Sequence, residues 1–390
     1  MKVLVLHPSL NRCGGAERVC LATVKALSAS GYSVHLATIE ETDWKLLEKR
    51  VGPVQRPVHE TYLIGSIPIS SNISNATYTV TLFLILLARY RVLRDFDLNF
   101  NTYGDLDVSL ADISYINAIP FSLMRLFPTP GFQSPSMRGF TSLYSLLTSL
   151  THKTFTRGIL LANSKFTKQL IEKFWMRGST VVYPPVDLDR FREVDFEDRE
   201  NVVVTVTRFR PGKELEIIPQ IAKKVDGCRF VVFGLVDAGA QETLKQLKES
   251  IIANQVSDRV EIRLNQCPAR IAETLLSSKV YLHTQSYEAF GISIVEAMAA
   301  GCVPVIPRRG GPWMDILGGR ERRYGLSFNS VGEAISKIET LLSSEETRIK
   351  IAQRAVDRAA FFDRRIFERR IAKVVDVFLS KRRPEPQIYG

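Results

Sequence analysis

The sequence predicts an α/β protein of two domains, each built on a parallel sheet, that face each other across a cleft. Three observations support this fold class. The chain has 390 residues, which is long for a single hydrophobic core. Short apolar segments of strand character alternate with segments of helical period. A turn-rich stretch at Tyr183-Pro-Pro-Val-Asp separates two such alternations.

The first alternation predicts a domain over residues 1–185. It opens with a strand at Val3–Leu6, a break at Gly14-Gly15 and a helix at Ala16–Ser30. Residues 120–150 mix aromatic, basic and proline residues with no clear period. Further short strands are expected at Val34–Ala37, Asp97–Asn101, Ser114–Ile116, Ile159–Ala162 and Thr180–Tyr183.

The second alternation predicts a domain over residues 186–363. A last helix at about 364–380 is expected to cross back and complete the first domain. Strands are expected at Val202–Thr207, Cys228–Phe233, Val260–Leu264, Val280–His283 and Val303–Ile306. Helices are expected near 213–226, 239–255, 269–278, 292–300, 332–343 and 346–361.

The composition indicates which kinds of partner and environment the protein has. The formal net charge is +11, which favours an anionic partner: a nucleic acid, an anionic lipid or a phosphorylated substrate. The five cysteines include no Cys-x-x-Cys pair, so we expect free thiols in a reducing compartment. The apolar run at 79–88 is too short to span a bilayer as a helix, which leaves a buried helix or a membrane-surface helix.

Two glutamates flank the predicted helix start after the strand Val280–His283. Glu288 and Glu296 are eight positions apart, with Gly291 between them. The first amides of a helix have no partner within it and form an anion site. Carboxylates beside such a phosphate site can accept hydrogen bonds from hydroxyls, which predicts a nucleoside diphosphate sugar. The alternative is a solvated loop residue and a helix-start charge favoured by the helix dipole.

Two cations and two glycines follow other strand ends. Arg208 and Lys213 flank Pro211-Gly212 after the strand Val202–Thr207, where they can neutralise a leaving diphosphate; the alternative is a pair of ordinary surface charges. Gly14-Gly15 lets the backbone approach a ligand closely, although a tight turn alone would also explain it. Three Asp-x-Asp spacings occur, but none lies in a loop expected beside the phosphates, so no metal site is predicted.

Taken together, these motifs resemble glycosyltransferase family 4, whose signature is a Glu-x7-Glu pair. The resemblance covers nearly the whole chain, and its beginning and its Gly-Gly-Pro segment most resemble the lipid-linked-oligosaccharide mannosyltransferases. It implies two facing Rossmann-like domains (the GT-B architecture) and a retaining, metal-independent hexosyl transfer. The resemblance rests on HPSLNRCGGAERV at 7–19, LANSKFTKQLI at 161–171, VVYPPVD at 181–187, TRFRPGKELE at 207–216 and SYEAFGISIVEAMAAGCVPVIPRRGGPWMDIL at 286–317.

The resemblance also implies roles for individual residues. Arg208 and Lys213 match the diphosphate-binding pair, Glu288 the glutamate near the donor hexose, and Glu296 the glutamate on the ribose. Where the family often has a histidine, this chain has Asn117, which can bind a sugar hydroxyl but cannot shuttle a proton at neutral pH. Residues matching donor-binding positions are Gly14, Gly15, Phe290, Gly291 and Ile292.

The resemblance implies no cofactor; the donor would be a nucleoside diphosphate sugar, with GDP-mannose favoured over UDP-sugars. The acceptor would be a glycan or a lipid-linked glycan, reached by peripheral contact with an anionic membrane at its cytosolic face. The aromatic and basic stretch at 120–150 is the expected acceptor side, unless it is a helix pair packed in the core. Alternatives are a nucleotide-sugar epimerase of the same fold and a non-catalytic basic protein that binds nucleic acid or membrane.

Overall fold

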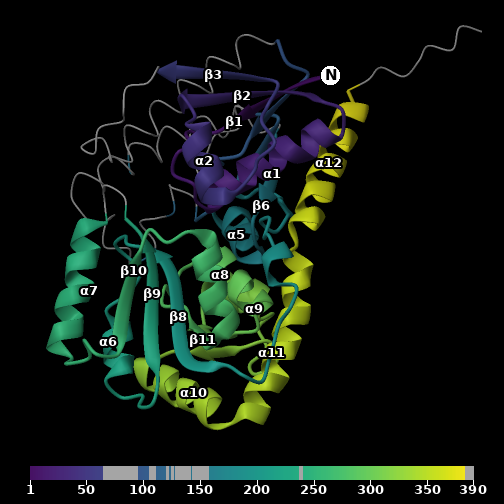
Figure 1. Ribbon diagram of the computed structural model, residues 1–390. Helices are drawn as coiled ribbons and strands as arrows, with labels where there is room; N and C mark the ends of the chain where they lie inside the picture. Colours follow the sequence, from purple (N-terminus) through teal and green to yellow (C-terminus); the bar gives the residue numbers. More distant parts are fainter. Residues whose placement is uncertain are drawn as a thin grey trace, which may run out of the picture.

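The computed structural model describes residues 1–64, 95–104, 111–119, 123, 127, 142, 158–236 and 240–382. Within them the chain forms two β-sheets flanked by helices, and every strand pair is parallel (Figure 1). The predicted α/β class is therefore confirmed.

The first sheet has the strand order β3-β2-β1-β4-β5-β6-β7. Its central strand β1 (Lys2–Leu6) is apolar and almost wholly buried, as expected for a strand covered on both faces. The direction of strand addition reverses between β1 and β4, so this is the switch point of the sheet. The other strands are β2 (Ser33–Glu40), β3 (His59–Ile64), β4 (Leu98–Asn101), β5 (Ile113–Ile116), β6 (Ile159–Ala162) and β7 (Thr180–Val181).

The second sheet has the order β10-β9-β8-β11-β12-β13, with its switch point between β8 and β11. Open parallel sheets bind ligands beyond the carboxyl ends of the strands at such points. The strands are β8 (Glu200–Arg208), β9 (Arg229–Leu235), β10 (Val260–Leu264), β11 (Ser278–Leu282), β12 (Val303–Pro307) and β13 (Leu326–Phe328).

Helices cover the faces of both sheets (Figure 1). The α-helices are α1 (Gly15–Ala29), α2 (Trp44–Val51), α5 (Lys165–Leu170), α6 (Ile217–Ala222), α7 (Gln241–Ala253), α8 (Pro268–Ser277), α9 (Ile292–Ala299), α10 (Val331–Ser343), α11 (Glu345–Ala359) and α12 (Arg364–Ser380). Shorter helical turns lie at Ile171–Trp175, Asp189–Phe191, Pro312–Ile316 and Ala360–Phe362.

The last helix ties the end of the chain to the first domain. Figure 1 shows α12 running beside α1, and the two helices are in contact. Four apolar side chains, spaced four residues apart, are buried in the core that β1 and α1 also line. Those side chains are Phe367, Ile371, Val375 and Leu379. The domain boundaries after residues 185 and 363 stay a prediction from the sequence.

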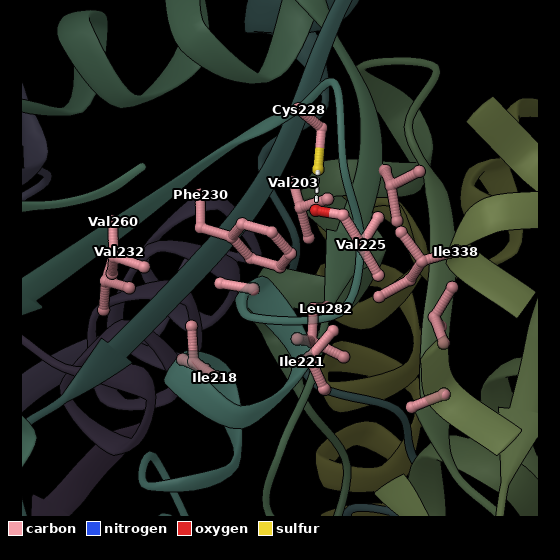
Figure 2. Close-up of a cluster of buried hydrophobic side chains, with 14 of the residues drawn as sticks. Val203, Ile218, Ile221, Val225, Cys228, Phe230, Val232, Val260, Leu282 and Ile338 are labelled. Carbon is pink, nitrogen blue, oxygen red and sulfur yellow. Dashed lines mark hydrogen bonds between the residues drawn. The ribbon is translucent and has the colours of Figure 1, made fainter. Parts of the chain in front are cut away.

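The second domain has its own core between the sheet and helices α6 and α10. Figure 2 shows Phe230 and Val232 of β9 in one apolar cluster with Ile218 and Ile221 of α6 and Ile338 of α10. In the same view the Cys228 thiol donates to a backbone carbonyl at the edge of this cluster. This rigid, apolar base fixes the strand ends on which the candidate site stands.

The structure corrects several predicted elements. The helix expected from about 213 begins only at Ile217, because Glu214 has a left-handed φ of 52°. The elements β3, β13, α2 and α5 were not predicted from the sequence. The segment 79–88 lies outside the described residues, as does most of 120–150. No helix among the described residues has the length and hydropathy to cross a membrane.

Candidate active site

The candidate site is formed by loops at the switch points of the two sheets. In the second sheet β8 ends at Arg208, and its neighbour β11 leads into the loop 283–291. In the first sheet β1 leads through Gly14 into α1. Ion pairs join these loops across the two domains, so the predicted donor residues of both meet in one place.

The loop that carries Glu288 is supported from behind by a glycine pair. The amide of Gly311 donates to the Glu288 carbonyl at 2.9 Å. A Cβ on Gly310 would lie 2.6 Å from that carbonyl oxygen, and one on Gly311 would lie 1.9 Å from the Ala289 oxygen. Because the obstructing atoms belong to the backbone, only glycine allows this close approach.

The same loop ends at the start of α9. Gly291 is the N-cap, with a φ of 99° that favours glycine. The first amides of α9, among them that of Ile292, therefore offer the predicted anion site. The side chain of Phe290 points away from it, since it is buried against Tyr183 and Phe362. Phe290 can thus contact a donor only through its backbone.

Lys213 and Glu288 form an ion pair inside the site. The Lys213 ammonium lies 3.2 Å from Glu288 Oε2 and also contacts Gln285 Oε1. Burial acts to raise the pKa of Glu288, but the charge of Lys213 and the hydrogen bonds from Lys213 and the Ala289 amide hold it below its usual value. Glu288 is therefore ionised at neutral pH and can accept hydrogen bonds from sugar hydroxyls.

Sequence reasoning missed the residues that fix Lys213 in place. Glu214 accepts hydrogen bonds from the amide and the hydroxyl of Ser286, at 3.0 and 2.8 Å. The Thr284 hydroxyl donates to the Lys213 carbonyl. His283 is buried beside this group, and burial lowers its pKa to about 4, so it is neutral at pH 7. A polar run directly after a buried strand was the signal that could have identified them.

Arg208 lies directly over Gly14 of the first domain. A Cβ on Gly14 would fall 1.1 Å from Nη2 of Arg208. The buried Glu17 joins these two residues, since its Oε2 accepts a hydrogen bond from the Gly14 amide at 2.7 Å and lies 3.5 Å from Arg208 Nη2. At the predicted glycine break, Arg208 of the second domain therefore contacts the first domain.

Glu296 also has a partner in the first domain. Nη1 of Arg18 lies 2.6 Å from Oε1 of Glu296, and the charge of Glu296 raises the pKa of Arg18 above its usual value. A Cβ on the neighbouring Gly15 would lie 3.3 Å from Ile292 Cδ1, so the starts of α1 and α9 abut. Neither Glu17 nor Arg18 was singled out from the sequence, although both lie within three residues of the glycine pair.

Asn117 lies at the end of β5, in a separate set of contacts. Its side-chain amide donates to the Thr102 carbonyl, and its own carbonyl accepts from Asn163. The hydroxyl of Thr102 contacts Nδ1 of the buried His7 at 2.9 Å. These residues follow β1, β4, β5 and β6, so they form a polar edge at the carboxyl ends of the first sheet.

Comparison with known proteins identifies the second domain. Residues 187–358 match the family described as "Glycosyl transferases group 1". This part of the chain is therefore similar to the group 1 glycosyltransferases. Arg208, Lys213, Glu288 and Glu296 all lie inside the matched range.

Two curated relatives of this chain carry the same name, "GDP-Man:Man(3)GlcNAc(2)-PP-Dol alpha-1,2-mannosyltransferase". The protein from Dictyostelium discoideum is 23% identical over 262 residues, which cover 62% of this chain and 50% of the relative. The protein from Xenopus laevis is 30% identical over 213 residues, which cover 50% of this chain and 44% of the relative. The chain thus spans about half the length of the curated relatives it matches.

Solved structures show that the two domains together form a GT-B glycosyltransferase fold. Sucrose-phosphate synthase from Thermosynechococcus elongatus matches with a TM-score of 0.75 at 14% identity, covering 98% of this chain and all of that chain. Anabaena HepE in complex with UDP and glucose matches with a TM-score of 0.72 at 18% identity, covering 97% and 100%. The predicted GT-B architecture is confirmed.

The Asp-x-Asp spacing that follows the first domain has structural partners. Asp187 and Asp189 pair with Arg364 at the start of α12, and Asp189 also pairs with Arg192 and Arg365. In the part of the chain that the structure describes, no cluster of three His, Cys, Asp or Glu side chains could hold a metal ion.

Proposed function

We propose that this glycosyltransferase transfers mannose from GDP-mannose to a lipid-linked oligosaccharide, with retention of configuration and without a metal ion. The observation that carries the proposal is the convergence of Arg208, Lys213, Glu288 and Glu296 beside the start of α9, in a chain whose relatives are named as GDP-mannose-dependent mannosyltransferases.

The donor diphosphate would lie against the start of α9. Arg208 and Lys213 supply two positive charges there, and the helix dipole adds a partial one. Charge that develops on the leaving diphosphate is then neutralised by groups already in place, which is the term that most lowers such barriers. This arrangement supports a mechanism in which no metal is required.

The two glutamates would hold the two sugars of the donor. Glu296 would accept hydrogen bonds from the ribose, and Glu288 from the hexose. Lys213 pairs with Glu288 at 3.2 Å, so the same cation would hold the hexose-binding carboxylate and face the phosphate. Loss of Lys213 would therefore disturb both positions.

Transfer with retention would proceed on one face of the hexose. The bond between the anomeric carbon and the phosphate oxygen breaks, and a bond to the acceptor oxygen forms on the same face. The acceptor proton moves to an oxygen of the departing diphosphate. Asn117 replaces the expected histidine, so we propose that it binds a sugar hydroxyl and carries no proton.

A transfer assay tests this function. GDP-mannose, UDP-glucose and UDP-galactose are each supplied with a polyprenyl-diphosphate-linked oligosaccharide, and the product anomer is read by NMR. We expect acceptor-dependent consumption of GDP-mannose, an α-linked product and no effect of EDTA. A β-linked product, or activity abolished by EDTA and restored by a divalent ion, would contradict the mechanism. Consumption of a UDP-sugar without consumption of GDP-mannose would contradict GDP-mannose as the donor.

Peripheral binding to an anionic membrane at its cytosolic face is part of the proposal, since the acceptor is lipid-linked and the net charge is +11. Flotation with anionic and neutral vesicles at low and high salt tests it. Binding only to anionic vesicles that weakens with salt is expected. A substitution of Phe127 would not test membrane contact alone, because the Phe127 ring contacts Tyr287 beside the site at a centroid distance of 5.1 Å.

A further inference from the structure

The first domain contributes one side chain to a predicted donor group. Arg18 lies in the first turn of α1, and its guanidinium reaches Glu296 on α9 at 2.6 Å. The Glu296 side chain is only 15% exposed, so its carboxylate has lost most of its hydration. A carboxylate in that setting needs a charged or hydrogen-bonded partner, and Arg18 supplies both.

The pair leaves room for a ligand at the carboxylate. A carboxylate offers about four acceptor positions on its two oxygens. The contact with Arg18 uses Oε1. Oε2 can then accept from a ribose hydroxyl, and the guanidinium fixes the direction in which it points. Oriented acceptors bind a hydroxyl more tightly than ones that must first be ordered.

We propose that Arg18 is a positioning residue that holds Glu296 in the orientation that binds the donor ribose. The inference rests on the proposed function, which gives Glu296 its ligand. Because Arg18 belongs to α1 and Glu296 to α9, the ribose subsite is complete only when the two domains are closed. Donor affinity therefore depends on Arg18, which belongs to the first domain and not to the domain that binds the donor.

One alternative predicts the opposite effect of removing Arg18 on nucleotide binding. Arg18 could occupy the place of the ribose and be displaced by it, in which case removing Arg18 would strengthen nucleotide binding. A purely structural role is the other rival: Arg18 would hold the domains together, and its loss would weaken every ligand in the cleft to a similar degree. The direction of the change and its dependence on the ribose hydroxyls separate the three cases.

The experiment measures calorimetric affinities for GDP and for 2′,3′-dideoxy-GDP, which lacks the ribose hydroxyls. The variants are Arg18→Ala, Arg18→Lys, Glu296→Gln and the double variant Arg18→Ala/Glu296→Gln. The matched control is Lys25→Ala, on the same helix, which breaks the pair of Lys25 with Glu368 at 3.1 Å. Thermal unfolding of each variant checks the fold.

We expect Arg18→Ala to weaken GDP by about 10- to 100-fold, the range for a hydrogen bond to a charged group. Dideoxy-GDP should bind the variant and the wild type alike. Arg18→Lys should recover part of the loss, and Arg18→Ala should add little in the Glu296→Gln background. Lys25→Ala should bind as the wild type does.

Tighter GDP binding by Arg18→Ala, or an equal loss for GDP and dideoxy-GDP, would overturn the positioning role while leaving the proposed function intact. No binding of GDP to the wild type would overturn the proposed function itself, and this role with it.

Discussion

Gly14→Ala should slow sugar transfer by displacing Arg208 and should leave the fold intact. The backbone of Gly14 has φ −104° and ψ −158°, a conformation that alanine also adopts. Alanine therefore brings no backbone strain. Its Cβ would, however, fall 1.1 Å from Nη2 and 2.4 Å from Cζ of Arg208, and 2.9 Å from Oε2 of Glu17. The glycine is needed for space and not for conformation.

The magnitude follows from these distances. Two carbon or nitrogen atoms in contact lie about 3.5 Å apart, so the guanidinium must move by more than about 2 Å. It is the end of a flexible side chain, so the unfolding free energy should change by less than about 1 kcal/mol. Misplacing a group that stabilises transition-state charge costs about a hundredfold in turnover.

The assay compares turnover of GDP-mannose by Gly14→Ala, Arg208→Ala and the double variant. All three should show the same loss, because each removes the same guanidinium from the same place. The control is Gly332→Ala in α10, whose Cβ would meet only Ser330 Oγ at 3.9 Å and which should retain turnover. Full activity of Gly14→Ala, or a double variant much slower than either single one, would refute the reasoning.

Three further predictions concern the rest of the site. Glu296→Gln should mainly weaken GDP binding, whereas Glu288→Gln should mainly lower the catalytic rate; equal losses of GDP affinity by calorimetry would show these roles to be wrong. Gly311→Ala should destabilise the protein and lower turnover, since its Cβ would lie 1.9 Å from the Ala289 carbonyl oxygen. If the variant unfolded at the same urea concentration as the wild type, this prediction would be wrong. Burial lowers the pKa of His283 from 6.5 to about 4, so the unfolded chain takes up this proton first and stability falls as pH drops from 6.5 toward 4. The loss is at most about 3 kcal/mol, and His283→Asn should reduce the pH slope of the unfolding free energy; an unchanged slope would argue against a neutral buried His283.

Much of the fold could be predicted because buried parallel strands are nearly pure apolar runs. The segment 202–207 is such a run, and the structure has a strand there, at Glu200–Arg208. The strand His59–Ile64 was missed because it pairs at the edge of the sheet and reads HETYLI, without a continuous apolar run. The late start of α6 depends on the tertiary contact of Glu214 with Ser286, which local sequence does not reveal.

The positions of the site residues could be predicted in part, for the same reason. Arg208 and Glu288 follow strands that turned out to be neighbours, so their loops had to meet at one sheet edge. Their partners could not be predicted, because Glu17 and Arg18 reach the site only through the way the two domains close on each other. No spacing within the chain encodes that closure. Whether each residue has the proposed role stays a prediction.

The central claim is that Arg208 and Lys213 bind the diphosphate of a nucleotide donor, and one titration tests it directly. GDP is titrated calorimetrically into the wild type, Arg208→Ala, Lys213→Ala and the control Arg229→Ala. The substitution Arg229→Ala also removes one positive charge. In the wild type, Arg229 pairs with Glu200 at the amino end of β8, away from the site. We predict that the wild type and Arg229→Ala bind one GDP with equal affinity and that the other two variants bind it at least about tenfold more weakly. Equal GDP affinity in all four proteins would contradict the account.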